Sequence, residues 1–140
     1  MKKSKAKGFT LIELMLVIII ITALAAVVFP RFVGRAQQAR IAAATTDINS
    51  NIAVALDLYE MDNGFYPATE QGLEALREKP ASSPVPQNWR GPYIKKKPID
   101  PWGNHYVYVS PGMHNEDYDL YSLGPDGVEG GGDDITNWEE

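Results

Sequence analysis

One acidic side chain lies inside the most apolar stretch of the chain. Glu13 is the only charged residue between Phe9 and Phe29. As a helix, these 21 residues would cross about 30 Å, the thickness of bilayer hydrocarbon. A carboxylate inside such a segment costs several kcal/mol unless it is paired, so it marks a functional position. Glu13 is therefore the first candidate functional residue.

Three aspartates near the C-terminus form the second candidate site. Asp126, Asp133 and Asp134 lie in a glycine-rich stretch, where the backbone can turn sharply and expose its carbonyls. Calcium accepts about six to eight oxygen ligands of this kind. Zinc is disfavoured, because the chain has no cysteine and no histidine pair. The stretch does not match the EF-hand pattern, so composition leaves a calcium site and an ion-free acidic loop equally open.

Several explanations compete for the apolar stretch and for the four lysines that precede it. An ordinary secretory signal peptide is disfavoured, because Glu13 interrupts the apolar region and no small-residue cleavage site closes it. A plain membrane anchor explains the length, and the lysines would keep that end in the cytoplasm. It gives no reason for the buried acid.

A third explanation comes from resemblance. Residues 7–14 read KGFTLIEL, which resembles the prepilin cleavage and methylation site of the type IV pilin and type II secretion pseudopilin superfamily. The resemblance implies that a prepilin peptidase cuts after Gly8 and that the new amine on Phe9 is methylated. In staggered helices, Glu13 of one copy could meet the Phe9 amine of a neighbour. Because a buried charge is tolerated when paired, we expect Glu13 to set the register of assembly.

Further stretches resemble the major pseudopilins of bacterial type II secretion systems. They are collinear and cover nearly the whole mature chain, at residues 59–67, 71–73, 91–94, 100–104, 124–127 and 133–138. Members of that family bind calcium in the C-terminal loop, so the resemblance implies Ca²⁺ as a cofactor. The ligands it implies are the carboxylates of Asp126, Asp133 and Asp134 and the backbone carbonyls of Leu123, Val128 and Gly131.

The elements that must position these residues begin with one long helix. Pro30 follows the apolar stretch, and we expect a helix kink or local melting there, because proline removes a backbone hydrogen bond. Apolar residues then recur at helical spacing from Ile41 to Tyr59, and Gly64 supplies a C-terminal stop. The pattern predicts a single helix from Phe9 to about Asp62, half in the membrane and half packed on a domain.

The remainder of the chain reads as a small sheet with loops. Thr69 is a candidate N-cap for a short helix that Pro80 ends. Alternating aromatic and β-branched residues predict strands at 105–109 and 118–123, and a weaker one at 92–96. Three antiparallel strands on one face of the long helix form an α+β domain of two layers. This is the type IV pilin-like fold that the resemblance implies, with the calcium loop at its C-terminal end.

The expected organisation is a leader at residues 1–8, a transmembrane and filament-core helix at 9–29, and a periplasmic globular domain at 30–140. The formal net charge is −5, and it becomes more negative when the leader lysines are removed. Nucleic-acid binding is therefore not expected, since phosphate contacts need clustered Lys and Arg. The chain contains no nucleophile elbow, Walker loop or zinc-protease motif, so we expect no enzymatic activity.

The resemblance implies a structural subunit of the type II secretion pseudopilus. The precursor would be a single-pass inner-membrane protein with a cytoplasmic N-terminus and a periplasmic domain. It would form a homopolymer, a helical filament that helps export folded proteins across the outer membrane, with minor pseudopilins and an inner-membrane assembly platform as partners. The alternatives are a type IV pilin of an adhesive or DNA-uptake pilus and, more distantly, a membrane-tethered calcium-dependent enzyme or binding module.

Overall fold

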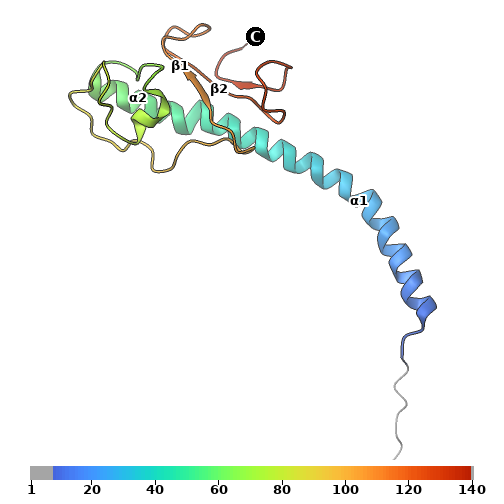
Figure 1. The fold of residues 1–140 in the computed structure, drawn as a ribbon. Helices are drawn as coiled ribbons and strands as arrows, with labels where there is room; N and C mark the ends of the chain where they lie inside the picture. The colour runs from blue at the N-terminus through green and yellow to red at the C-terminus, as the bar shows by residue number, and fades with distance from the viewer. Residues whose placement is uncertain (1–7, 140) are drawn as a thin grey trace, which may run out of the picture. The chain divides into compact units, whose positions relative to one another are not determined.

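The computed structural model describes residues 8–139 (Figure 1). Its elements are α1 (Leu11–Thr46), a π-helical turn η1 (Asp47–Asn51), α2 (Ile52–Asn63), a 3-10 helix η2 (Gly72–Leu76), and strands β1 (Val107–Val109), β2 (Asp119–Ser122) and β3 (Ile135–Thr136). The contacts divide the chain into two compact units, with the boundary after Gln38, inside α1.

The described part of the N-terminal unit is an apolar helix whose side chains form no buried core within residues 8–29. The large apolar side chains that the structure describes from Phe9 to Phe29 are all exposed. By length and composition this helix is apolar enough to cross a membrane. It begins at Leu11 rather than at Phe9, and it continues through position 30 without a break. Position 30 is thus helical in this structure, and a kink or local melting at Pro30 stays a prediction.

The long helical stretch ends where the sequence predicts. Gly64 adopts the left-handed conformation, with φ of 81°, and its N–H donates to the Glu60 carbonyl at 2.6 Å. A residue with a side chain is rarely stable in that conformation, so glycine is the usual C-terminal cap. The π-helical turn η1 between α1 and α2 was not predicted.

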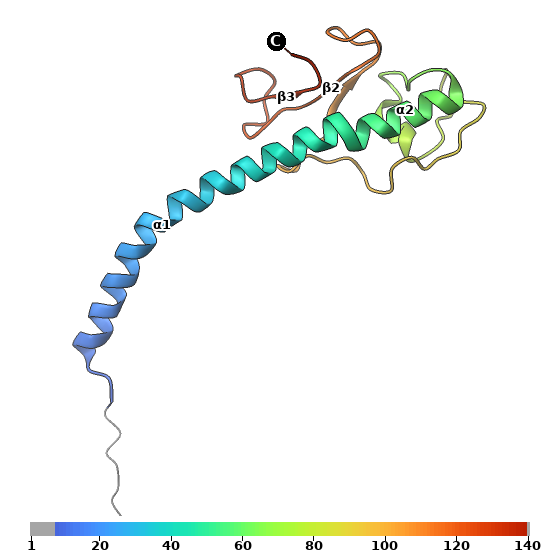
Figure 2. The same cartoon turned by 180° about the vertical axis from the view of Figure 1, so that it is seen from behind.

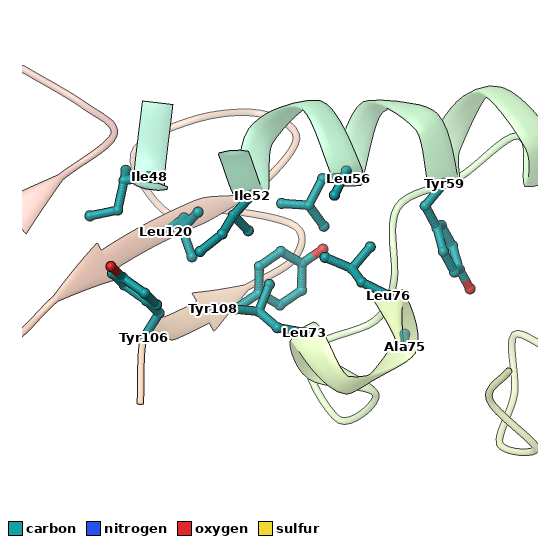
Figure 3. Packing of buried hydrophobic residues seen from close by; sticks show 11 residues of the cluster. Ile48, Ile52, Leu56, Tyr59, Leu73, Ala75, Leu76, Tyr106, Tyr108 and Leu120 are labelled. Atoms are coloured by element: carbon teal, nitrogen blue, oxygen red, sulfur yellow. The ribbon is translucent and has the colours of Figure 1, made fainter. Parts of the chain in front are cut away.

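Figure 3 shows how the core of the second unit is built. The helical residues Ile48, Ile52 and Leu56 point toward the strands and η2, and Leu120 of β2 lies opposite them. The buried cluster consists of Ile48, Ile52, Ala55, Leu56, Tyr59, Leu73, Ala75, Leu76, Tyr106, Tyr108 and Leu120. The predicted helical stripe is thus confirmed from Ile48 to Tyr59, whereas Ile41 is 40% exposed and lies outside the core.

The sheet has three antiparallel strands in the order β1-β2-β3. It lies beside the helical residues of the second unit (Figure 2). Tyr108 of β1 is opposite Leu120, and Ser122 of β2 is opposite Ile135 of β3. All four residues of the central strand β2 are buried. The α+β fold with a three-stranded antiparallel sheet is confirmed, but one of the three strands is not the one predicted.

The predicted strand at residues 92–96 is wrong. This segment is irregular, and its amides bond to η2 instead of to a strand. The backbone N–H groups of Tyr93 and Ile94 both donate to the Leu76 carbonyl, at 2.7 and 3.3 Å. The Tyr93 hydroxyl donates to Asp62 on α2 at 2.8 Å. The third strand is β3, inside the stretch that the sequence assigned to the C-terminal loop region.

Thr69 does not cap a helix. Its hydroxyl donates to the Ser110 carbonyl at 3.1 Å and accepts from the Ser110 N–H at 2.9 Å, which ties this loop to the end of β1. The short helix η2 begins after Gln71, a buried residue whose side-chain oxygen accepts from the Ala68 N–H at 3.1 Å. The predicted short helix is therefore present, but it is a 3-10 helix that starts after Gln71 and ends at Leu76, before Pro80.

Candidate functional site

The chemistry of Glu13 depends first on a near neighbour along the helix, Thr10. The Glu13 carboxylate accepts from the Thr10 backbone N–H at 2.9 Å and from the Thr10 hydroxyl at 3.0 Å. The Glu13 N–H donates to the Thr10 hydroxyl oxygen at 3.3 Å. These reciprocal bonds form a capping box at the start of α1. Sequence analysis missed Thr10, although the T-x-x-E spacing is the signal that could have identified it.

Gly8 and Phe9 precede the first turn of α1. Neither residue is helical, and Phe9 is 83% exposed. The peptide bond between them therefore lies in non-helical backbone just ahead of α1. Residues 1–7 of the predicted leader lie outside the described part of the chain.

The acidic C-terminal stretch is a loop closed by two paired strands. It runs from Leu123 to Asp134, between the ends of β2 and β3. Because Ser122 is paired with Ile135, the two ends of the loop are held side by side. The sheet therefore fixes the two ends of the loop that carries the predicted ligands, and the glycines allow the backbone between them to turn.

The structure brings two of the three predicted carboxylate ligands together. The Asp126 N–H donates to Asp133 Oδ2 at 3.2 Å. A β-carbon placed on Gly131 would lie 3.4 Å from Asp126 Oδ2 and 3.4 Å from Asp133 Oδ1. Both carboxylates therefore face the backbone at Gly131, where φ is 85°. This is an arrangement in which two carboxylates and a nearby carbonyl could share one cation.

Asp134 takes a different position. One oxygen of its carboxylate, Oδ2, accepts from the Gly130 N–H at 2.8 Å. The other, Oδ1, is buried and has no hydrogen-bond partner among the described residues. A buried carboxylate oxygen without a partner is costly, so Asp134 Oδ1 is a candidate ligand for a cation or a water molecule. Within residues 8–139, however, no three Asp, Glu or His side chains converge as a metal cluster, so carbonyls or water would have to complete the site.

Along the chain, the predicted carbonyl ligands precede the carboxylates or lie between Asp126 and Asp133. Leu123 is half-buried and directly follows β2. Val128 is 63% exposed, and its N–H donates to Asp126 Oδ1 at 2.8 Å, which holds this part of the loop against a predicted ligand. The donor types therefore fit a hard cation such as calcium.

Tyr121, which the sequence did not single out, lies close to the negative charges of the loop. The Tyr121 hydroxyl donates to Glu129 Oε1 at 2.9 Å. Burial, then this hydrogen bond and the nearby charges of Glu129, Asp134 and Asp119, raise the pKa of Tyr121 to about 12. A cation in the loop would offset that accumulated negative charge.

Comparisons with known families cover both candidate sites. Residues 3–29 match the family model described as the prokaryotic N-terminal methylation motif. Residues 31–138 match the family described as type II secretion system (T2SS), protein G. The first match contains Gly8, Phe9 and Glu13, and the second contains the whole acidic loop.

Individual relatives give the same result. The chain is 51% identical to the type II secretion system core protein G of Pseudomonas aeruginosa, over 99% of both chains. It is 50% identical to the protein of that name from Escherichia coli K12, over 96% of this chain and 92% of the relative. Among solved structures, it is similar to the major pseudopilin from the type 2 secretion system of enterohaemorrhagic Escherichia coli, with a TM-score of 0.68 and 43% identity. That similarity covers 75% of this chain and 87% of the other.

Proposed function

Because this chain belongs to the type II secretion system protein G family, we propose that it polymerises through its N-terminal helix into the filament that helps export folded proteins across the outer membrane. It is a structural subunit of the pseudopilus, and its long N-terminal helix and small antiparallel sheet match a major pseudopilin. The match over residues 31–138, together with the methylation motif ahead of it, is the observation that carries this function. It favours secretion over an adhesive or DNA-uptake pilus.

Processing is proposed to precede assembly. A prepilin peptidase would cut between Gly8 and Phe9 and methylate the Phe9 amine, which removes the leader lysines. Supporting this, both residues lie before the first helical turn, where the backbone is exposed. Mass spectrometry of the membrane-extracted protein should give a mature N-terminus at Phe9 with one added methyl group.

Glu13 is proposed to align each incoming subunit with the N-terminus of its neighbour. Within one chain its carboxylate already has a partner in Thr10, so pairing with a neighbour's amine must replace or share those hydrogen bonds. A full charge is a stronger partner for a carboxylate than a hydroxyl or an amide. Assembly can therefore draw Glu13 out of the capping box.

The test of this role is filament formation by Glu13→Gln, observed by electron microscopy of sheared or overproduced material. Glu70→Gln is a matched control, because Glu70 is exposed and lies far from the N-terminal motif in sequence. We expect normal cleavage for both variants and filaments for the control only. Filaments of Glu13→Gln in wild-type amounts would contradict the role of Glu13.

Calcium binding by the C-terminal loop is proposed as the source of its order. The residues that would hold the ion are Asp126, Asp133 and Asp134, with carbonyls of Leu123, Val128 and Gly131. Support comes from the two carboxylates that meet at Gly131 and from the unpartnered Asp134 Oδ1. Bound calcium supplies positive charge that links these oxygens, and an ion that binds only the folded loop stabilises the fold by mass action.

The calcium proposal is tested by thermal unfolding of the full chain in detergent micelles, with calcium and with chelator. Calcium should raise the melting temperature of the wild type, and the double variant Asp133→Ala with Asp134→Ala should lose that increase. The double variant Glu116→Ala with Asp117→Ala removes the same charge from another exposed loop and should keep it. A chelator that leaves wild-type stability unchanged would contradict calcium binding.

The remaining partners and the location follow from the family. We propose anchoring in the inner membrane by the apolar part of α1, with the leader in the cytoplasm and the domain in the periplasm, as the lysines require. The filament would contain minor pseudopilins and grow from an inner-membrane assembly platform. No enzymatic activity is proposed, because a polymer subunit acts through its contacts.

A further inference from the structure

A buried carboxylate outside the candidate site is fully engaged in hydrogen bonds. Asp100 is 4% exposed. Its Oδ1 accepts from the backbone N–H groups of Trp102 at 3.0 Å and of Asn104 at 2.8 Å. One oxygen of Asp100 therefore shapes the turn at residues 100–104 that precedes the sheet, and the other oxygen remains for a different partner.

The second oxygen reaches the last residue of β2. The Ser122 hydroxyl donates to Asp100 Oδ2 at 2.6 Å and accepts from the Gly124 N–H at 3.1 Å. Ser122 is fully buried, so water does not compete for these bonds. A short hydroxyl-to-carboxylate bond is among the stronger hydrogen bonds in proteins. Ser122 thus connects the 100–104 turn to the first residues of the acidic loop, Leu123 and Gly124.

Gly124, which donates to Ser122, is in turn packed against Asp133, one of the predicted carboxylate ligands. It adopts φ of 66°, and a β-carbon there would overlap the Asp133 carbonyl oxygen and lie 3.2 Å from Asp133 Oδ2. Asp133 Oδ2 in turn accepts from the Asp126 N–H. The contacts therefore run without a gap from Asp100 through Ser122 and Gly124 to the two carboxylates that meet at Gly131.

The same turn supports the loop at a second point. Asn104 Nδ2 lies 3.4 Å from the position that a β-carbon would take on Gly127. Gly127 lies between Asp126 and Val128, in the middle of the predicted ligands. The turn that Asp100 shapes is thus packed against the loop both at its beginning and near its centre.

From these contacts we propose that Asp100 and Ser122 are positioning residues for the cation loop, and this rests on the calcium binding proposed above. They do not touch the ion. They hold the Leu123 carbonyl and the backbone against Asp133 in the arrangement that binds it. When only a fraction of molecules has a binding-competent loop, the apparent affinity falls by that fraction. Loss of either side chain should therefore weaken calcium binding.

The test is the calcium dissociation constant of the full chain in detergent micelles, measured by competition with a chromophoric chelator. Ser122→Ala removes the connecting hydroxyl and should raise the dissociation constant about 10- to 100-fold, the range typical of residues that orient metal ligands. Asp100→Asn keeps an oxygen for the turn amides but removes the charge facing Ser122, so it should raise the constant by less.

Asp119→Asn is the matched control. Asp119 is also a buried carboxylate of β2, 2% exposed, but it accepts from the N–H groups of residues 113–115 rather than from the loop. Its replacement should lower stability and change the calcium dissociation constant less than Ser122→Ala does, because its charge lies near Tyr121 but it does not hold the loop backbone. A purely structural role for Ser122 would lower stability and leave the calcium dissociation constant at the wild-type value.

The outcomes separate this proposal from the calcium proposal itself. Wild-type affinity in both Ser122→Ala and Asp100→Asn, with circular dichroism showing folded protein, would overturn the positioning role alone. Absence of calcium binding by the wild-type chain would overturn calcium binding and the positioning role together. If Ser122→Ala does not fold, Asp100→Asn decides, because it retains the acceptor on which the 100–104 turn depends.

Discussion

The substitution Gly124→Ala probes the loop most directly, because it adds one carbon atom where the structure has no room for it. The new β-carbon would overlap the Asp133 carbonyl oxygen and lie 2.9 Å from the carbonyl carbon. Both atoms belong to the backbone, so no side-chain rotation relieves the contact. Either Gly124 leaves its left-handed conformation or Asp133 moves away from it.

Two costs add at this position. A residue with a β-carbon in the left-handed region costs about 1–2 kcal/mol. Forcing extra volume into a packed site costs about 1–3 kcal/mol more. We therefore expect Gly124→Ala to lower the free energy of unfolding by about 2–5 kcal/mol. Gly72→Ala separates the two costs, because Gly72 has a similar φ of 58° and no atom within 4 Å of its β-carbon position.

The assay is urea unfolding of the full chain in detergent micelles, followed by tryptophan fluorescence in the presence of chelator. Gly72→Ala should lower the free energy of unfolding only by the conformational cost of about 1–2 kcal/mol. Gly124→Ala should lower it clearly more. Calcium should also stabilise Gly72→Ala normally and Gly124→Ala less. Equal destabilisation by the two substitutions would refute the packing of Gly124 against Asp133.

Two further predictions concern the rest of the domain. Leu120→Ala should lower the free energy of unfolding by about 2–5 kcal/mol, because Leu120 is fully buried. Leu58→Ala, at an exposed helical position, should lower it much less. Thermal unfolding of the two variants tests this difference. Burial opposes the charged form of Asp119, but hydrogen bonds from residues 113–115 outweigh it and hold the pKa of Asp119 below its usual 3.8. This carboxylate therefore stabilises the fold above about pH 4, and its contribution disappears as the pH falls through the lowered pKa. Unfolding measured from pH 6 to pH 2 should show a shallower acid dependence for Asp119→Asn than for the wild type, and identical curves would contradict this role.

Features that depend on neighbours along the chain could be predicted without the structure. The apolar stretch, the long helix and its end at Gly64 all follow from composition, helical spacing and one glycine. The core stripe from Ile48 to Tyr59 follows in the same way, because residues three and four apart share a face of a helix. The processing motif at Gly8 and Phe9 is likewise contiguous, so the order of the residues along the chain is enough to recognise it.

The pairing of distant segments could not be predicted, because it depends on how the whole domain packs. A strand as short as β3 carries no alternating pattern, so Ile135 and Thr136 could not be distinguished from the loop. Residues 92–96 have strand-like composition, but the Leu76 carbonyl takes two of their amides. In the candidate site, the aspartates were identifiable from their type, whereas the connection from Asp100 through Ser122 was not. Those residues are 22 positions apart, and their hydrogen bond exists only because folding buries both.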